Sequence, residues 1–148
     1  MLALGCDHGG YPLMKEVIKY LEDNKIAFKN FGTYSEASVD YPEYAKKVAH
    51  AVADGECEKG ILICGTGIGM CITANKFPGI RAAVGHDCFS AERSILSNNG
   101  NVLCFGARVI GPELAKKILR EWITLEFQDG SSTPKVQAIL DIERENMK

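Results

Sequence analysis

Short apolar runs and segments with a helical spacing of apolar residues alternate along the whole chain. Four runs have the length and composition of strands buried on both faces, at residues 2–6, 61–64, 80–84 and 102–105. Residues 26–31 alternate between apolar and polar, which is typical of a half-exposed strand. Apolar residues that recur every three or four positions predict six helices, over residues 12–22, 44–52, 66–76, 88–96, 112–127 and 134–145.

The alternation of strand and helix predicts a single α/β domain over residues 1–148. Parallel strands joined by right-handed helical crossovers place helices on both faces of one five-stranded sheet. No linker, repeat or low-complexity segment interrupts this order. The helix predicted over residues 134–145 has no strand after it, so its apolar positions need another surface to cover. Either a neighbouring subunit or the chain's own sheet provides that surface.

The strand predicted at residues 61–64 ends in Cys64 and runs directly into Gly65-Thr66-Gly67-Ile68-Gly69. Glycines let the backbone approach a ligand closely, and the N-terminus of the following helix offers free N–H groups to an anion. A thiol at such a position suits proton transfer or nucleophilic attack. The alternative is a small buried cysteine beside a structural glycine turn. Ligands of open parallel sheets bind at the carboxyl ends of strands, which favours the functional interpretation.

Composition limits the classes of function. The chain has 148 residues, of which 46% are hydrophobic, and its net charge of −2 indicates neither nucleic acid nor an acidic membrane as a partner. It contains no run of 18 apolar residues and no N-terminal pattern of a signal peptide. Six cysteines without Cys-x-x-Cys spacing or a His/Cys cluster favour reduced thiols in a cytoplasm over disulfides or a metal site.

Further polar residues follow other predicted strands. Asp7 and His8 follow the first strand, so they should share a sheet edge with Cys64, where they bind sugar hydroxyls or phosphate or simply form a turn. Tyr41, at the start of the second helix, is either a wall of the pocket or ordinary packing. Arg108 follows the fifth strand, where it could bind an anion, although a lone arginine is more often a surface charge.

Two histidines and one polar loop are weaker candidates. His50 lies off the apolar stripe of its helix and is expected to be a solvated surface residue. His86 follows the fourth strand, near the expected mouth, but is more simply a loop residue. Residues 97–101 precede the fifth strand, at the edge opposite Cys64, so they could reach such a site only in another subunit.

Five segments of the chain match one known family. They are Gly-Cys-Asp-His-Gly-Gly at 5–10, Asp-Tyr-Pro at 40–42, Ile-Leu-Ile-Cys-Gly-Thr-Gly-Ile-Gly at 61–69, Ala-Asn-Lys-Phe-Pro-Gly-Ile-Arg-Ala at 74–82 and Asn-Val-Leu-Cys-Phe-Gly-Ala-Arg-Val-Ile-Gly at 101–111. Together they resemble the type B ribose-5-phosphate isomerases, a family that includes galactose-6-phosphate isomerase subunits. The resemblance covers essentially the whole chain. It implies a Rossmann-like fold, no metal or other cofactor, a cytoplasmic location, and a homodimer or tetramer whose sites lie between subunits.

The resemblance assigns roles at the reacting end of the sugar. Cys64 matches the catalytic base, which moves a proton between neighbouring carbons of the open-chain sugar. Residues 65–69 match the segment whose amides hold the enediolate oxygens, and the Thr66 hydroxyl matches a group that also contacts this end.

The remaining matches concern substrate binding. Asp7 and His8 match substrate-binding positions, with His8 as a phosphate contact. Asn98 matches an amide donated by the partner subunit, and Arg108 matches a phosphate-binding arginine.

The chain departs from the family pattern at three positions. Ser97 stands where the family commonly has a ring-opening histidine, and serine is a poor acid–base group near neutral pH. Ser131 and Lys135 stand where two arginines often bind phosphate. Serine cannot replace the planar guanidinium of arginine, which donates two parallel hydrogen bonds to a phosphate, and lysine offers only a point charge.

The resemblance implies an isomerase that interconverts ribose 5-phosphate and ribulose 5-phosphate, by thiolate proton transfer through a cis-enediolate. One alternative is a six-carbon substrate, allose 6-phosphate or galactose 6-phosphate. An alternative from another class is a non-enzymatic module that binds a nucleotide or a sugar phosphate. The usual Gly-x-Gly-x-x-Gly of a nucleotide-binding module would need glycine at position 70, where the chain has Met70.

Overall fold

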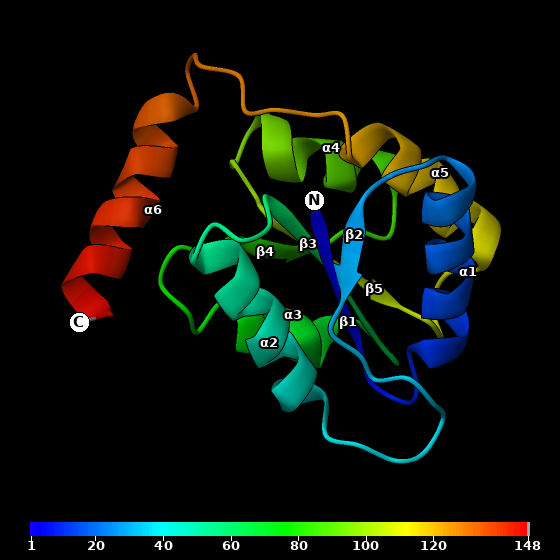
Figure 1. Ribbon diagram of the computed structural model, residues 1–148. Helices are drawn as coiled ribbons and strands as arrows, with labels where there is room; N and C mark the ends of the chain where they lie inside the picture. The colour runs from blue at the N-terminus through cyan, green and yellow to red at the C-terminus, as the bar shows by residue number, and fades with distance from the viewer. Residues whose placement is uncertain (148) are drawn as a thin grey trace.

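Five parallel strands form one sheet between two layers of helices (Figure 1). The structure is a computed structural model and describes residues 1–147. The strands lie in the order β2-β1-β3-β5-β4. Their bounds are β1 Leu2–Cys6, β2 Phe28–Asn30, β3 Lys59–Cys64, β4 Ala82–Val84 and β5 Val102–Gly106. The predicted α/β class and the five-stranded parallel sheet are confirmed.

Within residues 1–147, six helices lie between or after these strands, and their order is the predicted one. They are α1 Tyr11–Asp23, α2 Tyr41–Ala53, α3 Ile68–Ala74, α4 Cys88–Leu96, α5 Pro112–Trp122 and α6 Thr133–Asn146. Helices α1, α4 and α5 cover one face of the sheet, while α2 and α3 cover the other. Alternate residues of each strand therefore enter different cores. Ile63 packs under α1 and α5, whereas Leu62 and Cys64 face α2 and α3.

The path of the chain opens a crevice at the carboxyl ends of β1 and β3. After β1 the chain passes to the edge strand β2, and it then returns across β1 to form β3. The connections leaving β1 and β3 therefore diverge, as they do at the ligand-binding switch point of other open α/β sheets. Asp7 follows β1 and Cys64 ends β3, so both lie at this crevice.

The predicted helix over residues 112–127 is too long, because α5 ends at Trp122. The ammonium group of Lys59, at the start of β3, donates hydrogen bonds to three carbonyl oxygens at this helix end. They belong to Trp122 (3.1 Å), Ile123 (3.2 Å) and Leu125 (2.7 Å). A cation at the carboxyl end of a helix satisfies carbonyls that have no partner within the helix. This contact from a distant strand turns the chain away from the helical path.

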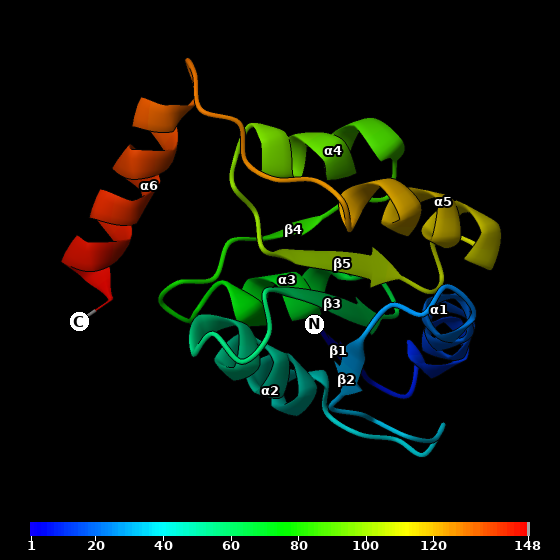
Figure 2. The same ribbon diagram turned by 45° about the horizontal axis from the view of Figure 1, so that its top comes forward.

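Helix α6 stands away from the sheet in both views (Figures 1 and 2). Of its apolar residues only Val136 is buried, and Ile139 and Ile142 remain 45% and 60% exposed. The carboxylate of Glu143 accepts a hydrogen bond from the Gly79 N–H at 2.9 Å, which ties the helix to the turn before β4. The chain's own sheet is therefore not the surface that α6 covers.

Candidate active site

Cys64 lies at the base of a tight glycine loop. Its side chain is 5% exposed, and its Sγ accepts a hydrogen bond from the Gly67 N–H at 3.1 Å. Gly67 has a φ of +82°, and a Cβ there would lie 2.9 Å from the carbonyl carbon of Phe105. Only glycine meets both conditions without strain, so residues 65–67 can turn closely around the sulfur before α3 begins at Ile68.

Backbone hydrogen bonds from the neighbouring strands hold this loop. The Ala107 N–H donates to the Cys64 carbonyl at 2.9 Å, and the Arg108 N–H donates to the Gly65 carbonyl at 3.0 Å. On the other side, the Asp7 N–H donates to the Ile63 carbonyl at 3.2 Å. The carboxyl ends of β1, β3 and β5 thus form one connected platform with the thiol at its centre.

A cavity of about 410 Å³ opens over the thiol and the loop. The ring of Tyr41 forms one wall and lies against Gly69, where an added Cβ would be only 2.5 Å from the ring. The residues that line the cavity are Asp7, Tyr41, Cys64, Gly65, Thr66, Ile68, Gly69, Ile72 and Arg108. A space of this size, with a buried thiol and backbone amides at its floor, is the usual form of a small-molecule site.

Two polar residues after β1 are held in defined orientations. Asp7 is buried, and its Oδ1 accepts a hydrogen bond from the Gly10 N–H at 2.8 Å. His8 accepts a hydrogen bond at Nδ1 from the Val39 N–H at 3.1 Å. Because Nδ1 is an acceptor, the hydrogen of the neutral ring sits on Nε2, which can donate to a ligand.

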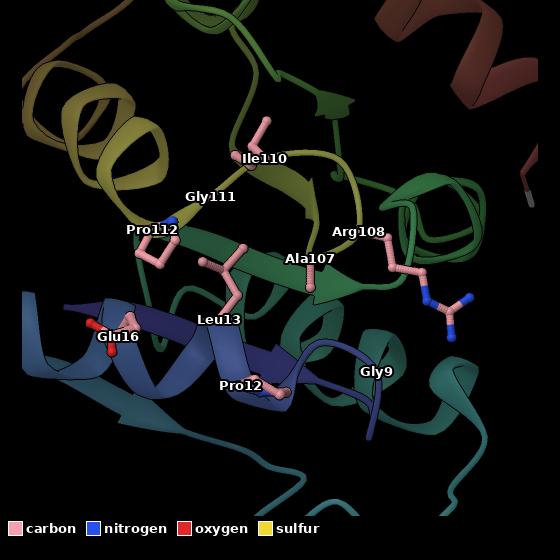
Figure 3. A pocket seen from close by; sticks show the side chains of 9 residues that line it. All are labelled: Gly9, Pro12, Leu13, Glu16, Ala107, Arg108, Ile110, Gly111 and Pro112. Carbon is pink, nitrogen blue, oxygen red and sulfur yellow. The ribbon is translucent and has the colours of Figure 1, made fainter.

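Arg108 is exposed and lines both the thiol cavity and a second cavity of about 380 Å³ (Figure 3). That second space lies between the N-termini of α1 and α5, and Figure 3 shows the Arg108 side chain extending away from Leu13 and Pro112. A Cβ on Gly65 would lie 3.5 Å from the guanidinium, so the charge sits directly beside the loop. A guanidinium in that position can bind an anion together with the loop amides.

The other residues that the resemblance selects are not near Cys64 within one chain. Ser97 caps the end of α4, where its Oγ accepts a hydrogen bond from Arg93 Nη1 at 3.2 Å, and the exposed Asn98 follows it. Ser131 and Lys135 are exposed just before and within the first turn of α6. In Figure 2 the arrowheads of β3 and β5 point away from α6, so these residues lie toward the opposite edge of the sheet.

The two remaining histidines have structural surroundings. His86 accepts a hydrogen bond at Nε2 from the Gly106 N–H at 2.7 Å, and burial lowers the pKa of its ring. It therefore helps to fix the end of β5 rather than facing the cavity. His50 is exposed on α2, as predicted, with its ring edge against Phe77 at 5.0 Å.

The sequence interpretation missed Ile72 and a second thiol. Ile72 lies one turn after Ile68 on α3, and this i, i+4 spacing could have placed it in the cavity wall. The pKa of Cys71 is lowered to about 7 because its thiol is hydrogen-bonded to that of Cys104, whose own pKa is raised. No local motif signals this pair, because Cys71 and Cys104 meet only when α3 packs on β5.

Residues 1–147 contain no helix that combines the length and the apolar character needed to cross a bilayer. Within the same residues there is no group of three or more His, Cys, Asp or Glu side chains that could hold a metal ion.

Comparison with known proteins identifies the family. Residues 2–139 match the model of the Ribose/Galactose Isomerase family. The chain belongs to this family. It is an aldose–ketose isomerase, because its family and its relatives have this activity in common.

Relatives align with this isomerase over nearly its whole length. Ribose-5-phosphate isomerase B of Escherichia coli is 47% identical, with 97% of this chain and 96% of the relative covered. D-erythrulose-4-phosphate isomerase of Pectobacterium atrosepticum is 46% identical, with coverages of 93% and 91%. The structure of ribose-5-phosphate isomerase B of Clostridium thermocellum superposes with a TM-score of 0.94 at 45% identity, covering 97% of each chain.

Proposed function

We propose that this isomerase interconverts ribose 5-phosphate and ribulose 5-phosphate, with Cys64 as the proton-transferring base. The observation that carries the proposal is the buried Cys64 sulfur beneath a loop of backbone amides, at the floor of a cavity of about 410 Å³. The E. coli and C. thermocellum relatives that share the fold are ribose-5-phosphate isomerases by name.

The chemistry follows from this arrangement. Cys64, as thiolate, removes the proton from C2 of the open-chain aldose, and the electrons form a cis-enediolate. Amides of residues 65–69 at the N-terminus of α3 stabilise its oxygens, each donor lowering such a barrier by about 3–4 kcal/mol. The Thr66 hydroxyl contacts the same end of the sugar. A proton passes from O2 to O1, and the Cys64 thiol returns its own proton to C1, which completes the ketose without any cofactor.

The phosphate end is assigned to the cationic and donor groups beside the loop. Arg108 contributes a guanidinium, and His8 contributes its Nε2–H, since Nδ1 is already an acceptor. Asp7 accepts hydrogen bonds from sugar hydroxyls, while Tyr41 closes the cavity against Gly69. Asp7, Tyr41 and Arg108 line the cavity over the thiol, and His8 directly follows Asp7.

The site is proposed to be completed by a second copy of the chain, in a homodimer or tetramer. Ser97, Asn98, Ser131 and Lys135 lie on the other edge of the sheet, so they can serve a site only in a neighbouring subunit. Two large apolar side chains beside the thiol cavity, Ile68 and Ile72, are 56% and 57% exposed. A second subunit packed against this face would bury them.

Helix α6, with its two exposed isoleucines, is proposed to lie at the interface between copies. The single domain over residues 1–148 is thus proposed to act as an oligomer. Its six cysteines are free thiols, which supports a cytoplasmic location.

A four-carbon substrate, D-erythrulose 4-phosphate, is the second candidate. A relative that is 46% identical is named for this substrate. In a tetrose 4-phosphate the C4 oxygen carries the phosphate, so no furanose ring can close and no ring-opening group is needed. Ser97, whose hydroxyl is a poor acid near neutral pH, fits such a substrate.

Turnover assays with purified protein test this function. Ribose 5-phosphate, erythrose 4-phosphate and the two hexose 6-phosphates are compared at equal concentrations, and ketose formation is followed. Ribose 5-phosphate is expected to give the highest kcat/KM, and Cys64→Ser is expected to lower kcat about a thousandfold. A preference for the tetrose phosphate would select the second candidate, and turnover of none of the four would overturn the proposal.

Ser97→His separates the two substrates further. If ring opening limits turnover, the introduced imidazole raises kcat for ribose 5-phosphate and leaves kcat for erythrose 4-phosphate unchanged.

A further inference from the structure

The loop at residues 97–101 is held far more firmly than its exposed position requires. Asn99 has a φ of +54°, in the left-handed region that asparagine adopts more readily than most residues. The Gly100 N–H donates to the Ser94 carbonyl at 2.6 Å, and a Cβ on Gly100 would lie 2.6 Å from that oxygen. The turn is therefore closely packed and tied to the end of α4.

Arg81, just before β4, imposes this conformation. Its Nε donates to the Asn99 carbonyl, and its backbone N–H donates to Asn101 Oδ1 at 2.8 Å. In return, the Asn101 N–H donates to the Arg81 carbonyl at 3.0 Å. The residue thus contacts the loop with its side chain and with both of its backbone groups.

The same network reaches the last helix. Asn101 Nδ2 donates to the Gly79 carbonyl at 2.8 Å, Arg81 Nη1 donates to it at 3.4 Å, and the Gly79 N–H donates to Glu143 on α6. Burial lowers the pKa of Arg81 and the Glu143 carboxylate opposes this, so the guanidinium lies partly desolvated between the loop and α6. A half-buried, multiply bonded guanidinium has little freedom to reorient.

The network fixes the backbone on both sides of Asn98, whose side chain contributes no hydrogen bond to the fold of its own chain. Within residues 1–147 its side chain is exposed and makes no hydrogen bond. Asn98 and Cys64 lie at opposite edges of the sheet, so rigidity of Asn98 has no effect on the Cys64 site of its own chain. It matters only if Asn98 faces a ligand held by another copy.

We propose that Arg81 is a positioning residue, which holds Asn98 in place for the active site of a neighbouring subunit. This inference rests on the proposed function, in which the site is shared between copies. Arg81 touches no substrate, and its effect passes through the backbone of Asn99. Because a displacement of about 1 Å in a substrate-contacting group can cost on the order of a hundredfold in rate, Arg81→Gln should lower kcat/KM by about 10- to 100-fold.

Mixed oligomers test the inference. Subunits carrying Cys64→Ser and Arg81→Gln are coexpressed with different tags, and the mixed dimer is isolated. One of its two sites combines the intact Cys64 of the Arg81→Gln subunit with the intact loop of the Cys64→Ser subunit. That site should work normally, so the mixed dimer should show about half of the wild-type activity, although both parent homodimers are impaired.

The controls separate positioning from folding. Arg120→Gln changes an exposed arginine on α5 and should leave kcat/KM and the melting temperature unchanged. Asn101→Ala removes the side chain that ties Arg81 to Gly79, so it should reproduce the loss and the recovery in mixed dimers if Arg81→Gln fails to fold. A Cys64→Ser and Asn98→Ala pair should recover in the same way.

The outcomes are distinct. If the mixed dimer stays at half the activity of the Arg81→Gln homodimer, Arg81 acts within its own subunit and the inference is wrong. Unchanged kcat/KM in the Arg81→Gln homodimer, or an active monomer, would also overturn it. An active Cys64→Ser homodimer would instead overturn the proposed function, together with the inference that rests on it.

Discussion

Replacing Gly67 by alanine isolates the contribution of the glycine loop to catalysis. Gly67 and Gly55 have nearly the same φ, +82° and +81°, but very different surroundings. A Cβ at Gly67 would lie 2.9 Å from the Phe105 carbonyl carbon, whereas a Cβ at Gly55 would meet nothing within 4 Å. The two substitutions to alanine therefore carry a similar free-energy cost from the positive φ, and only the substitution at Gly67 adds a steric clash.

The magnitudes follow from these distances. The left-handed conformation costs an L-residue about 1–2 kcal/mol, so Gly55→Ala should lower the melting temperature by about 2–8 °C. Gly67→Ala carries the same cost, and the loop must also move by about 0.5 Å, from 2.9 Å to an ordinary contact beyond 3.4 Å. If a 1 Å displacement costs on the order of a hundredfold in rate, half of it should lower kcat about tenfold.

The assay compares kcat and melting temperature for both variants. Gly55→Ala should keep the wild-type kcat, while Gly67→Ala should lower kcat about tenfold. The KM for the substrate should change only slightly, because the groups that bind the phosphate are unaltered. Equal kcat values in the two variants would refute the role of the loop. A tenfold loss in Gly55→Ala would show that strain anywhere in the fold has the same effect.

Two further predictions come from shifted pKa values. Burial lowers the pKa of His86 in the folded state, so its stabilising contribution is complete above the ordinary value of about 6.5 and is lost as the pH falls below it. The melting temperature should therefore fall between pH 7 and pH 5, and His86→Gln, which can still accept the Gly106 N–H, should flatten this part of the profile. Cys71, with a pKa of about 7, should be alkylated by iodoacetamide with a midpoint near pH 7. Cys6, with a pKa raised to about 12, should stay unmodified. Peptide mass spectrometry after labelling at pH 6–8.5 measures both, and equal labelling of the two cysteines would contradict this prediction.

Local patterns were sufficient for most of the fold. The helix expected over residues 88–96 has the observed bounds of α4, because Asp87 caps it by accepting a hydrogen bond from the Ser90 N–H at 2.7 Å. The overlong prediction for α5 shows the limit of such reasoning. The Lys59 ammonium that ends α5 comes from a strand more than 60 positions earlier, and no property of residues 112–127 reveals it.

The site was predictable to the extent that strand order determines it. Asp7 and Arg108 follow strands and Cys64 ends one, so the parallel sheet places all three at one edge, and they line one cavity. The thiol pair of Cys71 and Cys104 depends on how α3 packs against β5, which periodicity does not specify. The positions of Ser131 and Lys135 relative to any site depend on a second chain, so they remain predictions.

Hydrogen exchange at the reacting carbons of the substrate shows whether Cys64 is the base. The protein is incubated with ribose 5-phosphate in D₂O, and deuterium at C1 of ribulose 5-phosphate and at C2 of ribose 5-phosphate is followed by NMR for wild type and Cys64→Ser. The wild type is expected to place deuterium at C1 of the ribulose 5-phosphate that forms and at C2 of the ribose 5-phosphate that the reverse reaction regenerates, and a folded Cys64→Ser protein should do so at least about a hundredfold more slowly. Exchange at the wild-type rate in folded Cys64→Ser would contradict it, because another group would then be the base.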